Sequence, residues 1–157
     1  AWTVGASIQQ ESLAQRYFLG LVPTGAYSAT QSVHIGVDEI SSQYRLAAYD
    51  GSNSWLYSAT NQQVSTSAMK RVNVAYNGTT ARYLWVNGAD KGTDNTITAR
   101  STGIAHLNIG AAIENAMTDA WAGMVGFVYA RQGVLSDAWI AAEYASLNNP
   151  AGFYTIT

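Results

Sequence analysis

Apolar and polar residues alternate over short runs along this chain, and turn-forming residues separate most of the runs. Alternation places apolar side chains on one face of an extended strand, and strands repeated every ~8–12 residues are typical of β-sandwiches and barrels. The pattern predicts strands at residues 2–8, 16–21, 31–37, 43–49, 55–57, 70–76, 81–86, 107–110 and 121–129. Asn77-Gly78 and Asn87-Gly88 predict tight turns, because these pairs adopt the positive φ angles that hairpins require.

One segment near the end of the chain has helical periodicity. Ser136 is a favourable N-cap, and Asp137 in the first turn interacts well with the helix dipole. Three apolar residues at i, i+4 and i+7 would form one helical face: Ile140, Tyr144 and Leu147. Pro150 ends this helix of about 136–147, and residues 153–156 predict a short closing strand. We therefore predict an all-β fold of two antiparallel sheets with one short C-terminal helix.

Composition and charge narrow the class of protein. Of 157 residues, 48% are hydrophobic and only 11% are charged, which suits a single domain with a full core and an uncharged polar surface. The net charge is −2 and no basic cluster exceeds Lys70-Arg71, so we expect no nucleic-acid partner. Cysteine is absent, which excludes disulfides and thiolate metal sites. No apolar run approaches the ~18 residues of a membrane span, so we expect no membrane insertion.

Four motifs follow one another in the second half of the chain: LWVNG at 84–88, LNIG at 107–110, WAGMVGF at 121–127 and VLSDAWI at 134–140. In this order they resemble the hairpin, the Ile-Gly strand, the Gly-containing strand and the helix start of laminin-G-like domains. These domains belong to the concanavalin A-like lectin/glucanase superfamily. The helix sequence WIAAEY at 139–144 also resembles a bacterial or phage subgroup of that superfamily.

The resemblance covers about residues 70–157 and implies one jelly-roll domain over residues 1–157. This chain departs from the family at Phe127, where family members usually have Asp. Family domains also tend to open with a strand before the segment 2–8. Whether this domain lacks that first N-terminal strand stays open; without it, one sheet has a free edge, or an edge completed by a strand from elsewhere.

The acidic residues do not form the pattern of a glycoside hydrolase. Retaining hydrolases of this superfamily need two carboxyl groups ~5 Å apart on one strand face. Asp38 and Glu39 are adjacent, so they point to opposite faces of a strand, and the other acids stand apart or in loops. The two histidines, His34 and His106, have no Gly-x-Ser-x-Gly elbow to accompany them. We therefore expect no catalysis.

Calcium is the one metal for which the sequence offers candidate ligands. It takes six to eight oxygen ligands, and Asp90, Asp94 and Asn95 offer side-chain oxygens within a loop rich in Gly and Thr. The turn at 50–53 offers a second set. Asp and Asn also stabilise turns by bonding their own backbone, and this explanation is the preferred one. We expect no other cofactor.

Tyrosine and tryptophan are the most suggestive residues for binding, with ten Tyr and five Trp against three Phe. Each combines an apolar face with a hydrogen-bonding edge, which suits sugar rings and protein interfaces. Trp55 and Tyr57 share one face of a short strand that follows a turn with Asn53, and Tyr44 precedes the same turn. We predict these four residues as a ligand-binding platform, with packing between the sheets as the alternative. Three other residues are expected in the core: Trp2, Trp121 and Trp139.

These features favour a non-catalytic, lectin-like module that recognises glycans on an extracellular, cell or virion surface. The first alternative is a structural or decorating module of a larger assembly, such as a phage capsid or tail, which would contact protein partners. A glycoside hydrolase is the least favoured alternative, because converging carboxylates are missing from the pattern.

Overall fold

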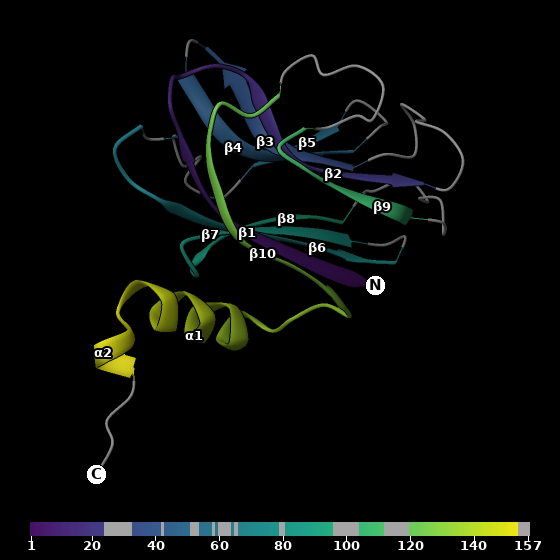
Figure 1. Ribbon diagram of the computed structural model, residues 1–157. Helices are drawn as coiled ribbons and strands as arrows, with labels where there is room; N and C mark the ends of the chain where they lie inside the picture. The colour runs from purple at the N-terminus through teal and green to yellow at the C-terminus, as the bar shows by residue number, and fades with distance from the viewer. Residues whose placement is uncertain are drawn as a thin grey trace.

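The computed structural model describes residues 1–23, 33–41, 43–50, 54–57, 59, 64, 66–78, 81–95, 104–111 and 120–153. Within these residues two five-stranded sheets face each other, and a helix and a short helical turn follow them in the chain (Figure 1). In chain order the elements are β1 (Trp2–Gln10), β2 (Arg16–Pro23), β3 (Val33–Ile40), β4 (Gln43–Asp50), β5 (Ser54–Tyr57), β6 (Lys70–Asn77), β7 (Ala81–Val86), β8 (Asp90–Asp94), β9 (Ile104–Ile109), β10 (Gly123–Gln132), α1 (Asp137–Asn148) and α2 (Pro150–Phe153). The predicted two-sheet sandwich with a C-terminal helix is confirmed.

The strands of the first sheet are ordered β10-β1-β6-β7-β8, and those of the second sheet β5-β4-β3-β2-β9. Every pairing within the two sheets is antiparallel. β1 pairs with β10 on one side and with β6 on the other, so segments from the two ends of the chain lie side by side. The N-terminal strand is therefore internal, and β10 forms an edge of the first sheet.

The hydrophobic core lies between the sheets and follows from the alternation of the strands. In β1, Val4, Ala6 and Ile8 are buried against the second sheet, while the residues between them face outward. The second sheet contributes its own alternate positions, including Ile35 and Val37. Each fully buried Val, Leu or Ile side chain stabilises the fold by roughly 1.5–3 kcal/mol, so these positions hold the two sheets together.

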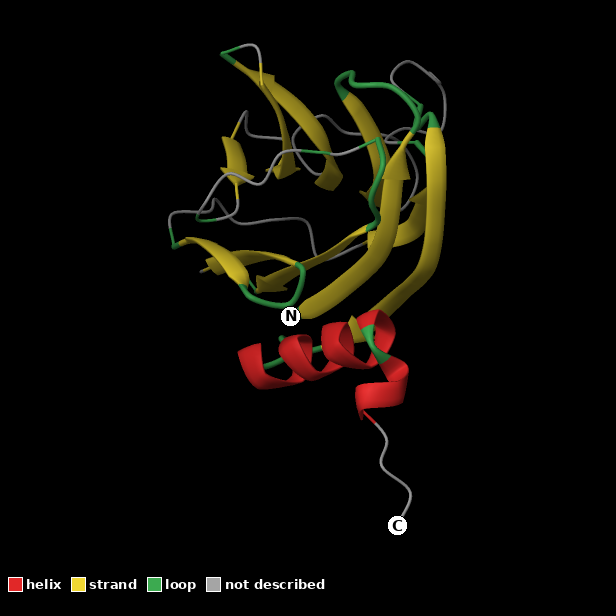
Figure 2. Ribbon diagram, turned by 90° about the vertical axis from the view of Figure 1, so that its left-hand side faces the viewer, coloured by secondary structure: helices red, strands yellow, loops and turns green. Residues whose placement is uncertain are grey.

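Helix α1 lies on the outer face of the first sheet, on the side away from the second sheet (Figure 2). Ser136 caps it as predicted, with its Oγ accepting a hydrogen bond from the Trp139 N–H at 3.2 Å. Ile140 is buried against Trp85 of β7 and Ala75 of β6. No helix in the described part of the chain is long and apolar enough to cross a membrane.

Three local predictions need correction. Residues 90–94 form strand β8 rather than a loop, because the turn at Asn87 and Gly88, both with positive φ, folds the chain back onto β7. Phe153 ends α2 instead of opening a closing strand, and residues 154–156 lie outside the described residues. Trp139 is 39% exposed instead of belonging to the core, because Ile140 is the α1 residue that faces the sheet.

Candidate functional site

The outer face of the second sheet carries a group of rings from four neighbouring strands, which we name the aromatic row. Ile35, Ala48 and Leu56 are buried in the core between the sheets, so their neighbours along each strand point to the opposite face. Those neighbours and the matching residue of β2 make up the row: Tyr17, His34, Tyr49, Trp55 and Tyr57. The register confirms this arrangement, since His34 pairs with Tyr49 and Tyr49 with Trp55.

The rings of the aromatic row lie in mutual contact. Trp55 is the central member, with its ring centroid 4.7 Å from Tyr49 and 6.5 Å from Tyr57. The rings of Trp55 and Tyr17 are nearly parallel, at an interplanar angle of 6° and a centroid distance of 6.3 Å. Tyr17 also meets His34 edge-on at 5.2 Å. Apart from the buried His34, the members of the row are partly exposed, so ring surface remains open to a ligand.

Small residues beneath the rings allow Tyr17 and Trp55 to approach each other across two intervening strands. Gly36 of β3 pairs with Tyr17 on one side and with Ala47 of β4 on the other, and Ala47 pairs with Tyr57. A Cβ on Gly36 would lie 2.8 Å from Tyr17 Cδ1 and 2.2 Å from the Arg16 carbonyl oxygen. Glycine at this position therefore allows both the backbone of β2 and the Tyr17 ring to lie close to β3.

A polar group borders the aromatic row at one end. The Tyr57 hydroxyl donates a short hydrogen bond to Asp38 Oδ2, and Gln15 Nε2 donates to Asp38 Oδ1 at 3.2 Å. Arg45 pairs with Asp38 across β3 and β4, and its Nη2 donates to Gln43 Oε1 at 2.7 Å. Burial and the hydrogen bond to Asp38 raise the pKa of Tyr57, so its hydroxyl stays protonated.

His34 is the buried member of the row, with 4% of its surface exposed. Burial disfavours its charged form and lowers its pKa from the ordinary 6.5 to about 4. The imidazole is therefore neutral at physiological pH, and it supports the rings of Tyr17 and Tyr49 as an uncharged packing residue.

The structure brings together only part of the predicted platform. Trp55 and Tyr57 lie side by side in the aromatic row, whereas Tyr44 packs against the core on the opposite face of the second sheet. Side chains of a strand alternate between its two faces, so Tyr44 shares a face with Leu46 and Ala48, both buried in the core. Asn53 lies outside the described residues.

Sequence reasoning missed Tyr17, Tyr49, Asp38 and Arg45. Tyr49 could have been predicted, because alternation along 43–49 places Tyr49 and Tyr44 on opposite faces of the strand. Asp38 and Arg45 also face each other across the hairpin of β3 and β4. Tyr17 joins the row only through the register of β2 against β3, which no local pattern reveals.

The predicted calcium ligands lie in and just after strand β8. The Asp94 carboxylate accepts a hydrogen bond from Nε of the buried Arg82 at 2.9 Å and forms an ion pair with its Nη2 at 2.8 Å, so a protein cation already neutralises it. Asn95 is exposed just beyond the strand. Among the described residues, no group of three or more acidic or histidine side chains is arranged to hold a metal ion. Calcium binding by Asp90, Asp94 and Asn95 stays a prediction, which a thermal-unfolding titration with calcium chloride tests.

The aromatic row combines apolar ring faces with polar groups, a combination that suits the binding of a ligand. Aromatic faces pack against apolar faces of a ligand, while tyrosine hydroxyls, Asp38 and Arg45 supply donors and acceptors beside them. Asp38 already accepts two hydrogen bonds, and its neighbour Glu39 lies on the other face of β3. Asp38 and Glu39 are therefore not placed together as the pair of carboxylates that glycoside hydrolysis requires.

Comparison with known proteins identifies the fold through structure alone. No family model matches the sequence, and no curated protein matches it significantly. The structure is similar to domain 4 of AbnA, an extracellular GH43 arabinanase from Geobacillus stearothermophilus in complex with arabinotriose (13% identity, TM-score 0.64). It is also similar to a heptameric SAP-like pentraxin from Limulus polyphemus (14%, 0.69) and to the Ruminococcus gnavus IT-sialidase CBM40 bound to alpha2,3 sialyllactose (17%, 0.67).

These alignments cover 92%, 91% and 91% of this chain and 66%, 69% and 82% of the three structures, respectively. The chain thus spans slightly less than two thirds of the arabinanase domain. A sialidase from Trypanosoma rangeli also matches, at 16% identity and a TM-score of 0.66, but the chain covers only 23% of it. At these identities the similarity establishes the fold. The fold is of the concanavalin A-like lectin/glucanase type, as the motifs predicted.

Proposed function

We propose that the chain is a non-catalytic module that binds glycans through the aromatic row, on an extracellular surface. The observation that carries this proposal is the nearly parallel pair of Tyr17 and Trp55, which lies beside the polar group of Asp38 and Arg45. Rings with adjacent donors and acceptors suit a sugar, whose apolar ring face and hydroxyl groups lie side by side.

The compared structures support the same proposal. Domain 4 of the arabinanase was solved with arabinotriose, and the CBM40 with sialyllactose. The arabinanase is described as extracellular, which agrees with the expected location. None of the compared structures named above is a virion protein, so a virion surface and a role in a phage particle gain no support from them.

A glycan-array screen followed by isothermal titration with the best-binding oligosaccharide tests the proposal. We expect Trp55→Ala to weaken binding at least tenfold, or about 1.4 kcal/mol, because it removes the central ring of the row. Trp139→Ala is the matched control, since it removes a tryptophan from α1 on the other side of the molecule. The bound oligosaccharide should be recovered intact after prolonged incubation with the chain.

Two results would contradict this function. One is the absence of any bound glycan for the folded chain, and the other is equal affinity for the wild type and Trp55→Ala. Hydrolysis of the oligosaccharide would instead overturn the non-catalytic part of the proposal. Circular dichroism of each variant shows that the fold is retained before affinities are compared.

A further inference from the structure

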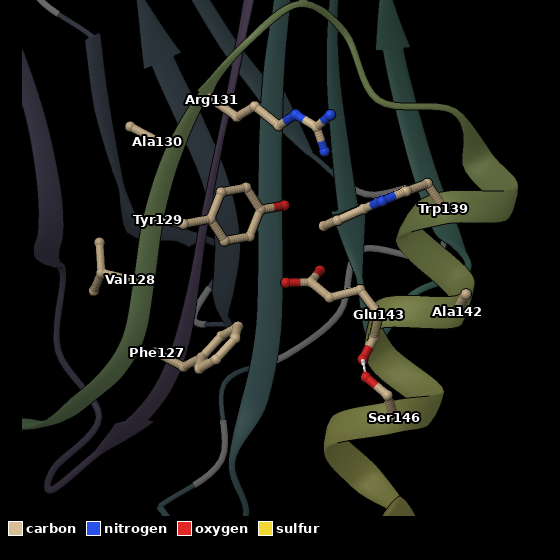
Figure 3. Close-up of a pocket in the computed structure, with 9 residues that line it drawn as sticks. All are labelled: Phe127, Val128, Tyr129, Ala130, Arg131, Trp139, Ala142, Glu143 and Ser146. Atoms are coloured by element: carbon tan, nitrogen blue, oxygen red, sulfur yellow. Dashed lines mark hydrogen bonds between the residues drawn. The ribbon is translucent and has the colours of Figure 1, made fainter. Parts of the chain in front are cut away.

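A groove of about 510 Å³ runs between the edge strand β10 and helix α1 (Figure 3). It belongs to the first sheet, whereas the aromatic row lies on the second sheet. Its walls are mostly apolar, with Phe127 and Tyr129 on the strand side and Trp139 and Ala142 on the helix side. Phe127 is 60% exposed and Trp139 is 39% exposed. Large exposed rings on both walls of one groove mark a surface that gains free energy when a partner covers it.

A β-bulge in β10 aims two rings into the groove. The register between β1 and β10 shifts between Gly5 and Ser7, and Phe127 takes a φ of 47° in the bulged segment. The inserted residue changes the alternation of β10, so that Val125 and Val128 both pack against the core while Phe127 and Tyr129 face outward. Positive φ disfavours a bulky residue such as Phe. The fold thus accepts local strain in order to present this ring.

A buried ion pair adjoins the groove, and its acidic member is one of the lining residues. Glu143 of α1 and Arg71 of β6 form a short salt bridge, with side-chain exposures of 6% and 3%. Glu143 Oε1 accepts a hydrogen bond from Arg71 Nη2, whereas Oε2 is buried and has no hydrogen-bond partner among the described residues. The carboxylate points from the helix toward β10, between the rings on the strand side (Figure 3). A buried acceptor without a donor is costly, so a small rotation of the Glu143 side chain that opens Oε2 to the groove would let a ligand N–H or O–H group satisfy it.

The charges around the groove restrict the kind of donor. Arg71 lies 5.0 Å from the Phe127 ring centroid and 5.2 Å from that of Tyr129, and Arg131 lies 5.8 Å from that of Trp139. Protein cations therefore already approach the rings, and Arg71 balances the charge of Glu143. A cationic ligand would meet this positive field, so a neutral donor fits Oε2 better.

The position of β10 at the edge of the first sheet favours a polypeptide over a small molecule as the ligand. The groove follows five consecutive residues of the strand, 127–131, and no described strand pairs with the outer side of β10. Main-chain N–H and C=O groups at a sheet edge bond best to another extended main chain. The mostly apolar walls offer few partners for the hydroxyl groups of a glycan.

We propose that the groove between β10 and α1 binds an extended peptide segment of a protein partner, which pairs with the edge of β10 and donates one uncharged side-chain hydrogen bond to Glu143 Oε2. Its apolar side chains cover Phe127 and Trp139. This site is independent of the proposed glycan site, because it lies on the other sheet and shares no residue with the aromatic row.

An array of capped nonapeptides with alternating Val and Thr and terminal Gln residues tests the proposal, with the central residue varied among Val, Ser, Asn, Asp and Lys. The full chain should bind the Ser and Asn members at least tenfold more tightly than the Val, Asp and Lys members in fluorescence anisotropy. N-methyl groups along one edge of the best peptide should abolish binding, whereas N-methyl groups along the other edge should leave it unchanged.

Two variants locate the bound peptide. Phe127→Asn removes the ring while keeping a residue that tolerates positive φ, and Glu143→Gln keeps an oxygen for Arg71 but replaces the free acceptor. Both should lose at least tenfold in peptide affinity while remaining folded by circular dichroism, whereas Trp55→Ala should bind peptide normally. The proposal is overturned if no member of the array binds, if both folded variants bind like the wild type, or if the two N-methylated series bind equally. Loss of glycan binding alone would leave it standing.

Discussion

The two outer faces of the sandwich carry the same local pattern with different outcomes. On β7 of the first sheet, Tyr83 and Trp85 occupy alternate positions, as Trp55 and Tyr57 do on β5 of the second sheet. Trp85 is 1% exposed beneath α1, and its Nε1 donates to Asp137 Oδ1 at 2.9 Å. Trp55 stays partly exposed among the rings of its own sheet. An aromatic pair thus defines a face of a strand without defining what covers it.

Helix α1 makes the difference between the two faces. It buries Ile140 against Trp85 and packs closely on the turn after β7, where a Cβ on Gly88 would lie 2.7 Å from Tyr144 Cβ. Two ion pairs, Arg71 with Glu143 and Lys91 with Asp137, join the helix to the first sheet. Beneath α1 the outer face of the first sheet is thereby covered, while that of the second sheet retains exposed ring surface.

The largest expected effect compares the two tryptophans directly. Trp85→Ala should lower the free energy of unfolding by about 3–5 kcal/mol, because it leaves a cavity under α1 and removes the hydrogen bond to Asp137. Trp55→Ala should lower it by roughly 1 kcal/mol, because its ring is not enclosed between two elements. Urea unfolding followed by circular dichroism measures both. Equal losses for the two variants would show that the faces do not differ in the way described.

A pH effect of intermediate size belongs to the aromatic row. Burial lowers the pKa of His34 from 6.5 to about 4, so the unfolded chain binds more protons than the folded chain between these values. Stability should therefore fall as the pH drops through this window, by up to about 3 kcal/mol, and this contribution should level off below about pH 4. Urea unfolding at a series of pH values measures it.

His34→Gln provides the control for that series. A side chain that does not titrate should remove the stability change between pH 6.5 and about 4, whatever the substitution does to stability at pH 7. An unchanged pH dependence in His34→Gln would assign the effect to other groups.

The smallest expected effect concerns the ion pair that fastens the start of α1. The hydrogen bond from Lys91, and next the one from Trp85, lower the pKa of Asp137 below its ordinary 3.8. A lowered carboxyl pKa stabilises the fold above pH 3.8, and this stabilisation is lost as the pH falls through the folded value. Because the Asp137 side chain is 65% exposed, the contribution should stay below about 1 kcal/mol. Thermal unfolding of Asp137→Asn at pH 7 and at pH values below 3.8 should show a difference from the wild type that shrinks on acidification; a constant difference would exclude the charge as its cause.

Alternation was a good guide to the strands and an incomplete guide to the site. It predicted β6 and β7 almost to the residue and placed Trp55 and Tyr57 on one face. It missed β8, because a strand with Asp at both ends and Gly in the middle has no apolar alternation of its own. Tyr44 was grouped with the wrong neighbours, although its parity with Leu46 already indicated the core.

The positions that depend on tertiary contacts were beyond local patterns. Trp139 and Ile140 are adjacent and both apolar, and only the placement of α1 on the first sheet decides that Ile140 is buried while Trp139 borders the groove. In the same way, Tyr17 approaches Trp55 only because β2 and β5 lie in one sheet with Gly36 and Ala47 between them.

Local sequence was therefore sufficient for the sandwich, the capped helix and the identity of the aromatic residues, because backbone periodicity and turn chemistry act over a few neighbouring residues. Strand order, register and the position of α1 depend on contacts between distant segments, such as β1 between β10 and β6. These contacts decided that one aromatic face is covered by a helix and the other is left partly open. They also created the groove in which one oxygen atom of Glu143 has no hydrogen-bond donor among the described residues.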